Sequence, residues 1–258
     1  MKRLQNGFTI TELLVVIILS ALFSTLILYF FINYFRYGYL LQADLETLTT
    51  RLNAGDFLRE AVGTSTGLII QNGIGDTHTN NPDPAISSNL YWVPIHAIPG
   101  NKPVGSSGTS TPLIYFRRFS LNSSGNYIMN GSQPYEDEYV LYLDGTAKSL
   151  MQRTLANPGA TGDRAKTSCP PALATASCPA DKTVASDLGS VDSRYFSRTA
   201  NLIDYTSITD PNTGAYIGPD FTAVEVVEFT LNLTKKAALQ TTYATSNSTV
   251  IRIALRDS

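Results

Sequence analysis

The feature that most constrains this chain is an uncharged apolar run at residues 13–32, preceded by one acidic residue, Glu12. The run has about the 20 residues that a helix needs to cross a bilayer. A carboxylate on such a helix is costly, by about 2.5–3.5 kcal/mol at the membrane centre. We therefore expect a membrane-spanning helix near the N-terminus, with a partner that compensates the charge of Glu12.

The residues before the apolar run form a short basic leader, Met1-Lys2-Arg3-Leu4-Gln5-Asn6-Gly7, followed by Phe8. Gly7 has no side chain, so a protease can approach the backbone closely there. The order of basic leader, Gly, Phe, Glu12 and apolar span resembles the type IV pilin family, which includes the type II secretion pseudopilins. The resemblance covers about the first thirty residues. It implies that a prepilin peptidase cuts the Gly7–Phe8 bond, that residues 1–7 are removed, and that Phe8 is N-methylated.

The resemblance also implies a role for Glu12 in assembly, since it becomes the fifth residue of the mature chain. Cleavage creates a cationic amine on Phe8 in or near the apolar layer. Glu12 can neutralise the Phe8 amine of a neighbouring subunit or its own, and such a pair would favour docking because an unpaired buried charge is costly. The alternative is an interfacial Glu12 whose side chain extends to the lipid headgroups.

Two other interpretations of the N-terminus are a secretory signal peptide and a plain membrane anchor. A secretory signal peptide usually has an apolar stretch of 7–15 residues closed by a small-x-small cleavage site, and this run is longer and has no such site. A plain anchor leaves the Gly7–Phe8 junction and Glu12 unexplained. Lys2 and Arg3 should stay cytoplasmic by the positive-inside rule. We therefore expect a single-pass membrane protein with an extracytoplasmic head, found after assembly in a pilus or pseudopilus at the cell surface or in the periplasm.

The helix should continue beyond the membrane. We expect it over residues 8–62, with the transmembrane segment at about 13–35. Leu41, Leu45, Leu48 and Leu52 recur at helical spacing, which predicts an amphipathic face. We expect that face mainly to pack against the head, with contact to neighbouring subunits as the alternative.

Residues 63–258 change to a strand pattern, so the predicted fold class is α+β, with the long helix packed on a mostly antiparallel β-sheet head. Asp144-Gly145 between two strand-like runs predicts a hairpin with a two-residue turn in which both residues have positive φ. A phase change near Val226-Val227 predicts a β-bulge. The expected strands lie at residues 68–70, 90–98, 113–121, 138–143, 146–153, 227–233 and 250–255.

Residues 154–200 are rich in Ala, Thr, Ser, Pro and Gly, and such a segment buries too little apolar surface to order itself fully. We therefore expect a flexible loop. It contains Cys169 and Cys178, the chain's two cysteines, and a disulfide between them suits an extracytoplasmic head. Two free thiols are the alternative. Two sulfurs without a nearby histidine do not complete a tetrahedral metal shell.

No catalytic constellation is apparent in the sequence. His78 and His96 have no acidic or cysteine partner at triad or metal-ligand spacing. Residues 210–214, with Asp220, weakly resemble an oxygen-rich calcium loop but do not follow its ligand order, so a turn is expected. The formal net charge is −2 with no cluster of Lys and Arg, so nucleic-acid binding is not indicated. We expect no catalytic residues, metal or cofactor.

The resemblance implies a non-catalytic subunit of a type IV pilus-like filament. The size and strand-rich pattern of the head are most similar to J-type minor pseudopilins and W-type minor pilins, which help to initiate assembly. The implied partners are the prepilin peptidase, other pilin or pseudopilin subunits, the membrane platform of the assembly machine, and membrane lipid. The alternatives are a major structural pilin and a pilin-anchored adhesin or DNA receptor.

Overall fold

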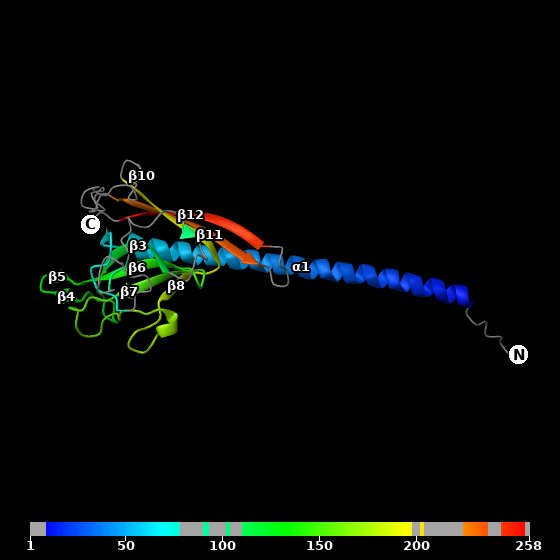
Figure 1. The fold of residues 1–258 in the computed structure, drawn as a ribbon, viewed down its shortest axis with the longest axis horizontal. Helices are drawn as coiled ribbons and strands as arrows, with labels where there is room; N and C mark the ends of the chain where they lie inside the picture. The colour runs from blue at the N-terminus through cyan, green and yellow to red at the C-terminus, as the bar shows by residue number, and fades with distance from the viewer. Residues whose placement is uncertain are drawn as a thin grey trace. The chain divides into compact units, whose positions relative to one another are not determined.

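The computed structural model describes residues 9–77, 90–92, 102–103, 110–197, 202–203, 224–236 and 244–255. These residues form one long α-helix and a set of antiparallel strands, which confirms the predicted α+β class (Figure 1). The elements are α1 (Ile10–Gly63), β1 (Gly67–Ile69), β2 (Lys102–Pro103), β3 (Ser110–Phe119), β4 (Met129–Asn130), β5 (Gln133–Pro134), β6 (Glu136–Asp144), β7 (Ser149–Leu155), η2 (Pro171–Leu173), β8 (Lys182–Ala185), β9 (Leu188–Phe196), β10 (Leu202–Ile203), β11 (Val226–Lys236) and β12 (Ala244–Ala254).

Helix α1 is long and apolar enough to cross a membrane. It has 54 residues, and its most apolar stretch is entirely exposed. A helix suits a bilayer because its backbone hydrogen bonds are made within the segment. The chain forms two compact units, residues 1–46 with 236–245 and residues 47–235 with 246–258, and α1 contributes to both.

Within the second unit, which we call the head, α1 buries a different face from the one that the leucine spacing predicted. Leu48 and Leu52 are 44% and 59% exposed, and Leu41 and Leu45, in the first unit, are also exposed. The buried side chains are instead Ala54, Leu58, Ala61 and Val62. The expectation that the leucine stripe packs on the head is therefore wrong. These four side chains belong to the hydrophobic core of the head.

The close approach of α1 is visible at its glycines. A Cβ placed on Gly55 would lie 3.8 Å from Ile251 Cδ1, and one on Gly63 would lie 3.5 Å from Ile253 Cγ2. Both isoleucines come from β12 and are 3% exposed. The alternation predicted for the last strand is thus confirmed, and its apolar face lies against the helix.

The head contains two larger sheets and a small hairpin. One sheet has the order β1-β3-β6-β7-β8, the other has the order β10-β9-β11-β12 with β2 also paired to β9, and β4 pairs with β5. The two larger sheets meet at β3 and β9, where Tyr195 Oη donates a hydrogen bond of 2.7 Å to the Leu113 carbonyl. A shared core lies beneath both sheets, and it includes Phe116, Tyr142 and Phe229.

The predicted hairpin is present, but its turn is not of the predicted kind. Strands β6 and β7 pair from Glu138↔Leu155 to Asp144↔Ser149, so four residues form the loop. Asp144 Oδ1 accepts the N–H groups of Thr146 and Ala147, at 2.9 and 3.0 Å, and the non-glycine residue with positive φ here is Lys148. The aspartate side chain therefore closes a wider turn in place of the two-residue one.

Two further expectations are corrected, and a third lies mostly outside the described residues. Residues 154–200 were expected to be loop, but this stretch contains β8 and β9, which bury Val184, Leu188 and Val191. The register shift of β11 lies at Asn232/Leu233 and not at Val226-Val227. Of the strand expected at 90–98, residues 93–98 lie outside the described part of the chain.

Candidate functional site

Glu12 lies in the first turn of α1 and closes its N-terminal end. The Thr9 backbone N–H and hydroxyl donate to Glu12 Oε2 at 3.0 and 2.8 Å, and the Glu12 N–H donates to Thr9 Oγ1 at 3.3 Å. This reciprocal arrangement is a capping box, in which two backbone donors of the first turn are satisfied by side chains. The carboxylate is thereby directed toward the start of the chain.

The capping box adds a third role for Glu12, beside the amine pairing and the headgroup contact expected above. The signal was readable in the sequence, because Thr-x-x-Glu before an apolar run is the capping-box pattern. The expected processing site, Gly7 and Phe8, lies outside the described residues, as do His78, His96 and the stretch from Asp210 to Asp220.

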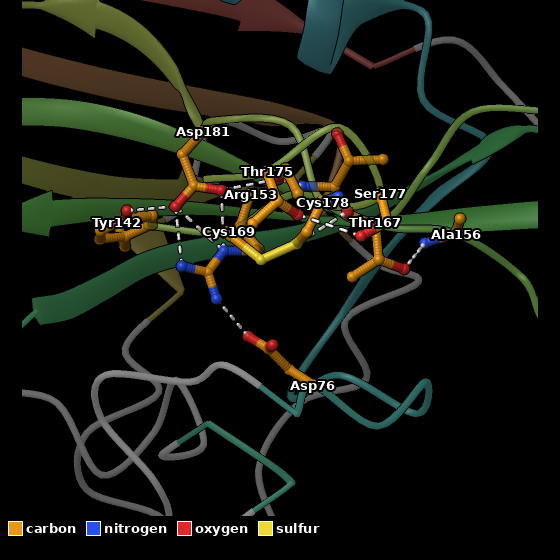
Figure 2. The surroundings of a disulfide bond; sticks show 12 residues. Asp76, Tyr142, Arg153, Ala156, Thr167, Cys169, Thr175, Ser177, Cys178 and Asp181 are labelled. Carbon is orange, nitrogen blue, oxygen red and sulfur yellow. Dashed lines mark hydrogen bonds and ion pairs between the residues drawn. A yellow bond between two sulfur atoms is a disulfide. The ribbon is translucent and has the colours of Figure 1, made fainter. Parts of the chain in front are cut away.

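Cys169 and Cys178 form the disulfide that was the preferred interpretation of the sequence (Figure 2). The bond closes a loop with a sequence separation of nine and a Cα–Cα distance of 5.6 Å. Cys169 is fully buried, whereas Cys178 is partly exposed. The loop carries the short 3-10 helix η2, and its residues 171–177 are exposed.

A buried polar cluster lies next to this disulfide, and we call it the Arg153 centre. Arg153 Nη1 donates to Asp76 Oδ2 at 2.7 Å, and Arg153 Nε and Nη2 donate to the Asp181 carboxylate at 2.7–3.0 Å. All three side chains are fully buried. The members of the centre are Arg153, Asp76, Asp181, Tyr142, Trp92 and Ser168.

The remaining members of the Arg153 centre donate to its two carboxylates. Tyr142 Oη and Ser168 Oγ donate to Asp181, both at 2.6 Å, and Trp92 Nε1 donates to Asp76 Oδ2 at 2.8 Å. The guanidinium carbon also lies 5.6 Å from the Trp92 ring centroid and 5.7 Å from that of Tyr142. Charges are stable in a protein interior only when paired and hydrogen-bonded in this way.

The surroundings shift the ionisation of two members of the centre. Burial acts to lower the pKa of Arg153, but its hydrogen bonds to Asp181 and the charges of Asp76 and Asp181 outweigh burial and raise it. Burial, followed by the charge and hydrogen bond of Asp181, raises the pKa of Tyr142. Arg153 is therefore a permanent cation, and Tyr142 stays a neutral donor.

Sequence reasoning did not find the Arg153 centre. Arg153 belongs to β7, whose residues are buried on both faces, so alternation did not distinguish it. Asp76 lies in a loop 77 residues away in sequence, and Asp181 lies 28 residues away. None of its charged or aromatic side chains reaches solvent, so we interpret the centre as a structural tie between three segments. The described residues hold no group of three or more His, Cys, Asp or Glu placed to bind a metal ion.

The raised pKa of Tyr142 predicts a loss of stability at alkaline pH. The folded state disfavours the phenolate form of Tyr142, so the neutral phenol adds to the free energy of unfolding. This contribution is complete below the pKa of tyrosine in the unfolded chain, about 10, and is lost as the pH rises toward the higher pKa of the folded state. The loss should be about 1.4 kcal/mol per pH unit above pH 10. Urea unfolding from pH 8 to 11 should therefore show a shallower alkaline slope for Tyr142→Phe than for the unchanged protein.

The control for this prediction is Tyr127→Phe, which removes a hydroxyl from a ring that is 59% exposed. It should leave the alkaline slope unchanged. At neutral pH, Tyr142→Phe should also cost about 1.5–3 kcal/mol, because Asp181 loses a hydrogen bond to its charge. Equal slopes for Tyr142→Phe and the unchanged protein would contradict the prediction.

Comparisons of the chain with protein-family models, with curated proteins and with solved structures found no match.

Proposed function

We propose that this chain is a non-catalytic minor pilin or pseudopilin subunit that is processed at Gly7–Phe8, held in the membrane and assembled through α1 into a type IV pilus-like filament. The head then lies on the extracytoplasmic side and helps to initiate assembly. The observation that carries the proposal is the extent of exposed apolar surface along α1. The prepilin-like leader described above gives that surface a context.

The exposed apolar surface of α1 is longer than a bilayer can cover. Large apolar side chains are exposed from Ile10 to Leu52. A helix of 54 residues is about 80 Å long, whereas the hydrocarbon core of a bilayer is about 30 Å thick. Soluble surfaces rarely leave so much contiguous apolar area in water. The part beyond the membrane includes the exposed side chains of Leu41, Leu48 and Leu52, and the helices of neighbouring subunits would cover them.

The geometry of Glu12 supports the same proposal. Its carboxylate is bonded to the N–H of Thr9, the residue that follows Phe8. Cleavage before Phe8 would create an ammonium group one residue away from that N–H. The first turn of α1 thus holds an acid whose hydrogen-bond partner is the residue next in sequence to the proposed new cation.

The deciding experiment is intact-mass measurement and N-terminal sequencing of the protein isolated from membranes. We expect a chain that begins at N-methylated Phe8. Gly7→Leu should block removal of the leader, because bulk at the scissile bond excludes the peptidase. A matched control is Gln5→Leu, which places the same side chain two residues away and should be processed normally. A mature-sized product from Gly7→Leu would contradict cleavage at the Gly7–Phe8 bond. An unchanged protein that still begins at Met1 would do the same, and the N-terminal helix would then be a membrane anchor alone.

One observation favours a second function, binding through the head. Phe119, Leu121, Tyr127 and Met129 are 37–59% exposed around the β4–β5 hairpin, and the Phe119 and Tyr127 rings meet edge to face at 5.3 Å. Exposed aromatic side chains suit a pilin-anchored adhesin. Glycan-array and DNA-binding measurements on the full chain in detergent distinguish a binding function of the head from a purely structural one. A separate measurement, the abundance of the chain in sheared filaments, distinguishes a major from a minor subunit.

A further inference from the structure

Two members of the Arg153 centre, Ser168 and Asp181, flank the loop that the disulfide closes. Ser168 directly precedes Cys169, and its hydroxyl donates to Asp181 Oδ1 at 2.6 Å. The Cys169 N–H donates to the Pro179 carbonyl, and the Asp181 N–H donates to the Cys169 carbonyl, both at 2.8 Å (Figure 2). The disulfide therefore closes a loop whose two ends present Ser168 and Asp181 to Arg153.

Asp181 is the main partner of the Arg153 guanidinium. It accepts from both Nε and Nη2, while Asp76 accepts from Nη1 on the other side. Asp76 in turn holds the indole of Trp92, which is fully buried. A chain of direct contacts thus runs from the disulfide through Asp181 and Arg153 to Asp76 and Trp92.

The two cysteines differ in exposure. Cys169 is 0% exposed, whereas Cys178 is partly exposed and follows the exposed residues 171–177. Thiol–disulfide exchange requires an incoming thiolate to reach the sulfur that it attacks. In the folded head, an external thiol can reach Cys178 far more readily than Cys169.

We propose that the Cys169–Cys178 disulfide is a redox-sensitive lock on the Arg153 centre, and that it opens at Cys178. The reductant is a small or protein dithiol. Its thiolate attacks Cys178 Sγ to form a mixed disulfide and releases the Cys169 thiolate, which takes up a proton. The second thiolate of the reductant then attacks the reductant's other sulfur, which is bonded to Cys178 Sγ in the mixed disulfide. This step releases the Cys178 thiolate, which takes up a proton, and leaves the reductant as a disulfide. Two electrons pass to the two cysteines.

Reducing the disulfide returns conformational entropy to the loop that it closes. For this sequence separation, the equilibrium constant for local opening of the loop should rise about a hundredfold. Asp181 then loses its fixed position, and Arg153, Asp76 and Trp92 loosen with it. The effect stays local, because Glu138 still accepts the N–H groups of Gly73 and Ile74 at 2.6 and 2.7 Å. The lock closes in an oxidising compartment and opens in a reducing one. This inference concerns the head and does not depend on how the N-terminus is processed.

Trp92 is the chain's one tryptophan, so its fluorescence reports the far side of the Arg153 centre. The experiment treats the full chain in detergent with dithiothreitol, with reduction confirmed by alkylation and intact mass. We expect a red shift of Trp92 emission, stronger acrylamide quenching, and a rise of about a hundredfold in the opening equilibrium of the Cys169 and Asp181 amides measured by hydrogen exchange. The control, Cys169→Ser/Cys178→Ser, should resemble the reduced protein and ignore dithiothreitol.

The entry point is tested with the two single variants. In Cys169→Ser the remaining Cys178 thiol should react with a disulfide reagent about ten times faster than the Cys169 thiol in Cys178→Ser. Equal rates would overturn opening at Cys178. Complete reduction of the unchanged protein with no change in Trp92 emission or quenching would overturn the lock. That measurement uses the native chain, so it stands even if a cysteine variant fails to fold.

Discussion

Replacing Arg153 with methionine is expected to lower the free energy of unfolding of the head by about 3–5 kcal/mol. Methionine fills much of the same volume, but it leaves Asp76 and Asp181 buried without the cation that both carboxylates contact. Domains are stable by about 5–15 kcal/mol, so the loss is a large fraction of the total. Urea unfolding of the full chain in detergent, followed by Trp92 fluorescence, measures it.

The matched control is Arg117→Met, the same substitution in an ion pair whose arginine is partly exposed and whose carboxylate is buried. Arg117 Nη2 lies 3.0 Å from Glu138 Oε1, but its side chain is 41% exposed. Glu138 also keeps two backbone donors when the arginine is removed. Water that reaches Arg117 weakens its attraction to Glu138, so the loss of Arg117 should cost less than the loss of the fully buried Arg153. Similar losses from Arg117→Met and Arg153→Met would contradict the assignment of the Arg153 centre as a principal support of the head.

The contrast between these two arginines shows where sequence reasoning ends. Periodicity predicted α1, the β6–β7 hairpin and the buried residues of β11, because each depends on neighbours in the chain. The Arg153 centre depends on partners 28 and 77 residues away, and nothing local to β7 indicates them. The same limit applies to β9, which was placed in an expected loop and gains its order by pairing with β11.

The leucine stripe of α1 shows a second limit. Helical spacing indicates that a helix has an apolar face, but this helix has two of them. Leu48 and Leu52 form part of one, and Ala54, Leu58 and Ala61 form part of the other. Leu48 and Leu52 are exposed, whereas Ala54, Leu58 and Ala61 belong to the buried core, and helical spacing alone does not tell which of the two faces is buried. In the proposed filament, the exposed leucines are the residues that contact the helices of neighbouring subunits.

Replacing Glu12 with glutamine is expected to leave processing intact and to reduce incorporation into filaments by about tenfold or more. Glutamine can still close the capping box, so the first turn of α1 is preserved. The negative charge is removed, however, and under the proposed processing the ammonium group on Phe8 would enter the filament without a counter-charge. An unpaired buried charge costs several kcal/mol, and about 1.4 kcal/mol is already tenfold. Quantitative immunoblotting of sheared filaments against membranes measures the ratio.

The companion variant, Thr9→Ala, makes the opposite change. It removes the hydroxyl that bonds Glu12 but keeps the carboxylate, at a cost of about 1 kcal/mol in helix capping. If the charge of Glu12 drives assembly, Thr9→Ala should assemble within a few fold of the unchanged protein while Glu12→Gln does not. If Glu12 serves only as a helix cap, Glu12→Gln should be incorporated into filaments normally, and Thr9→Ala should be incorporated less well than Glu12→Gln. The order of the two variants therefore separates the charge from the cap, because each removes one and keeps the other.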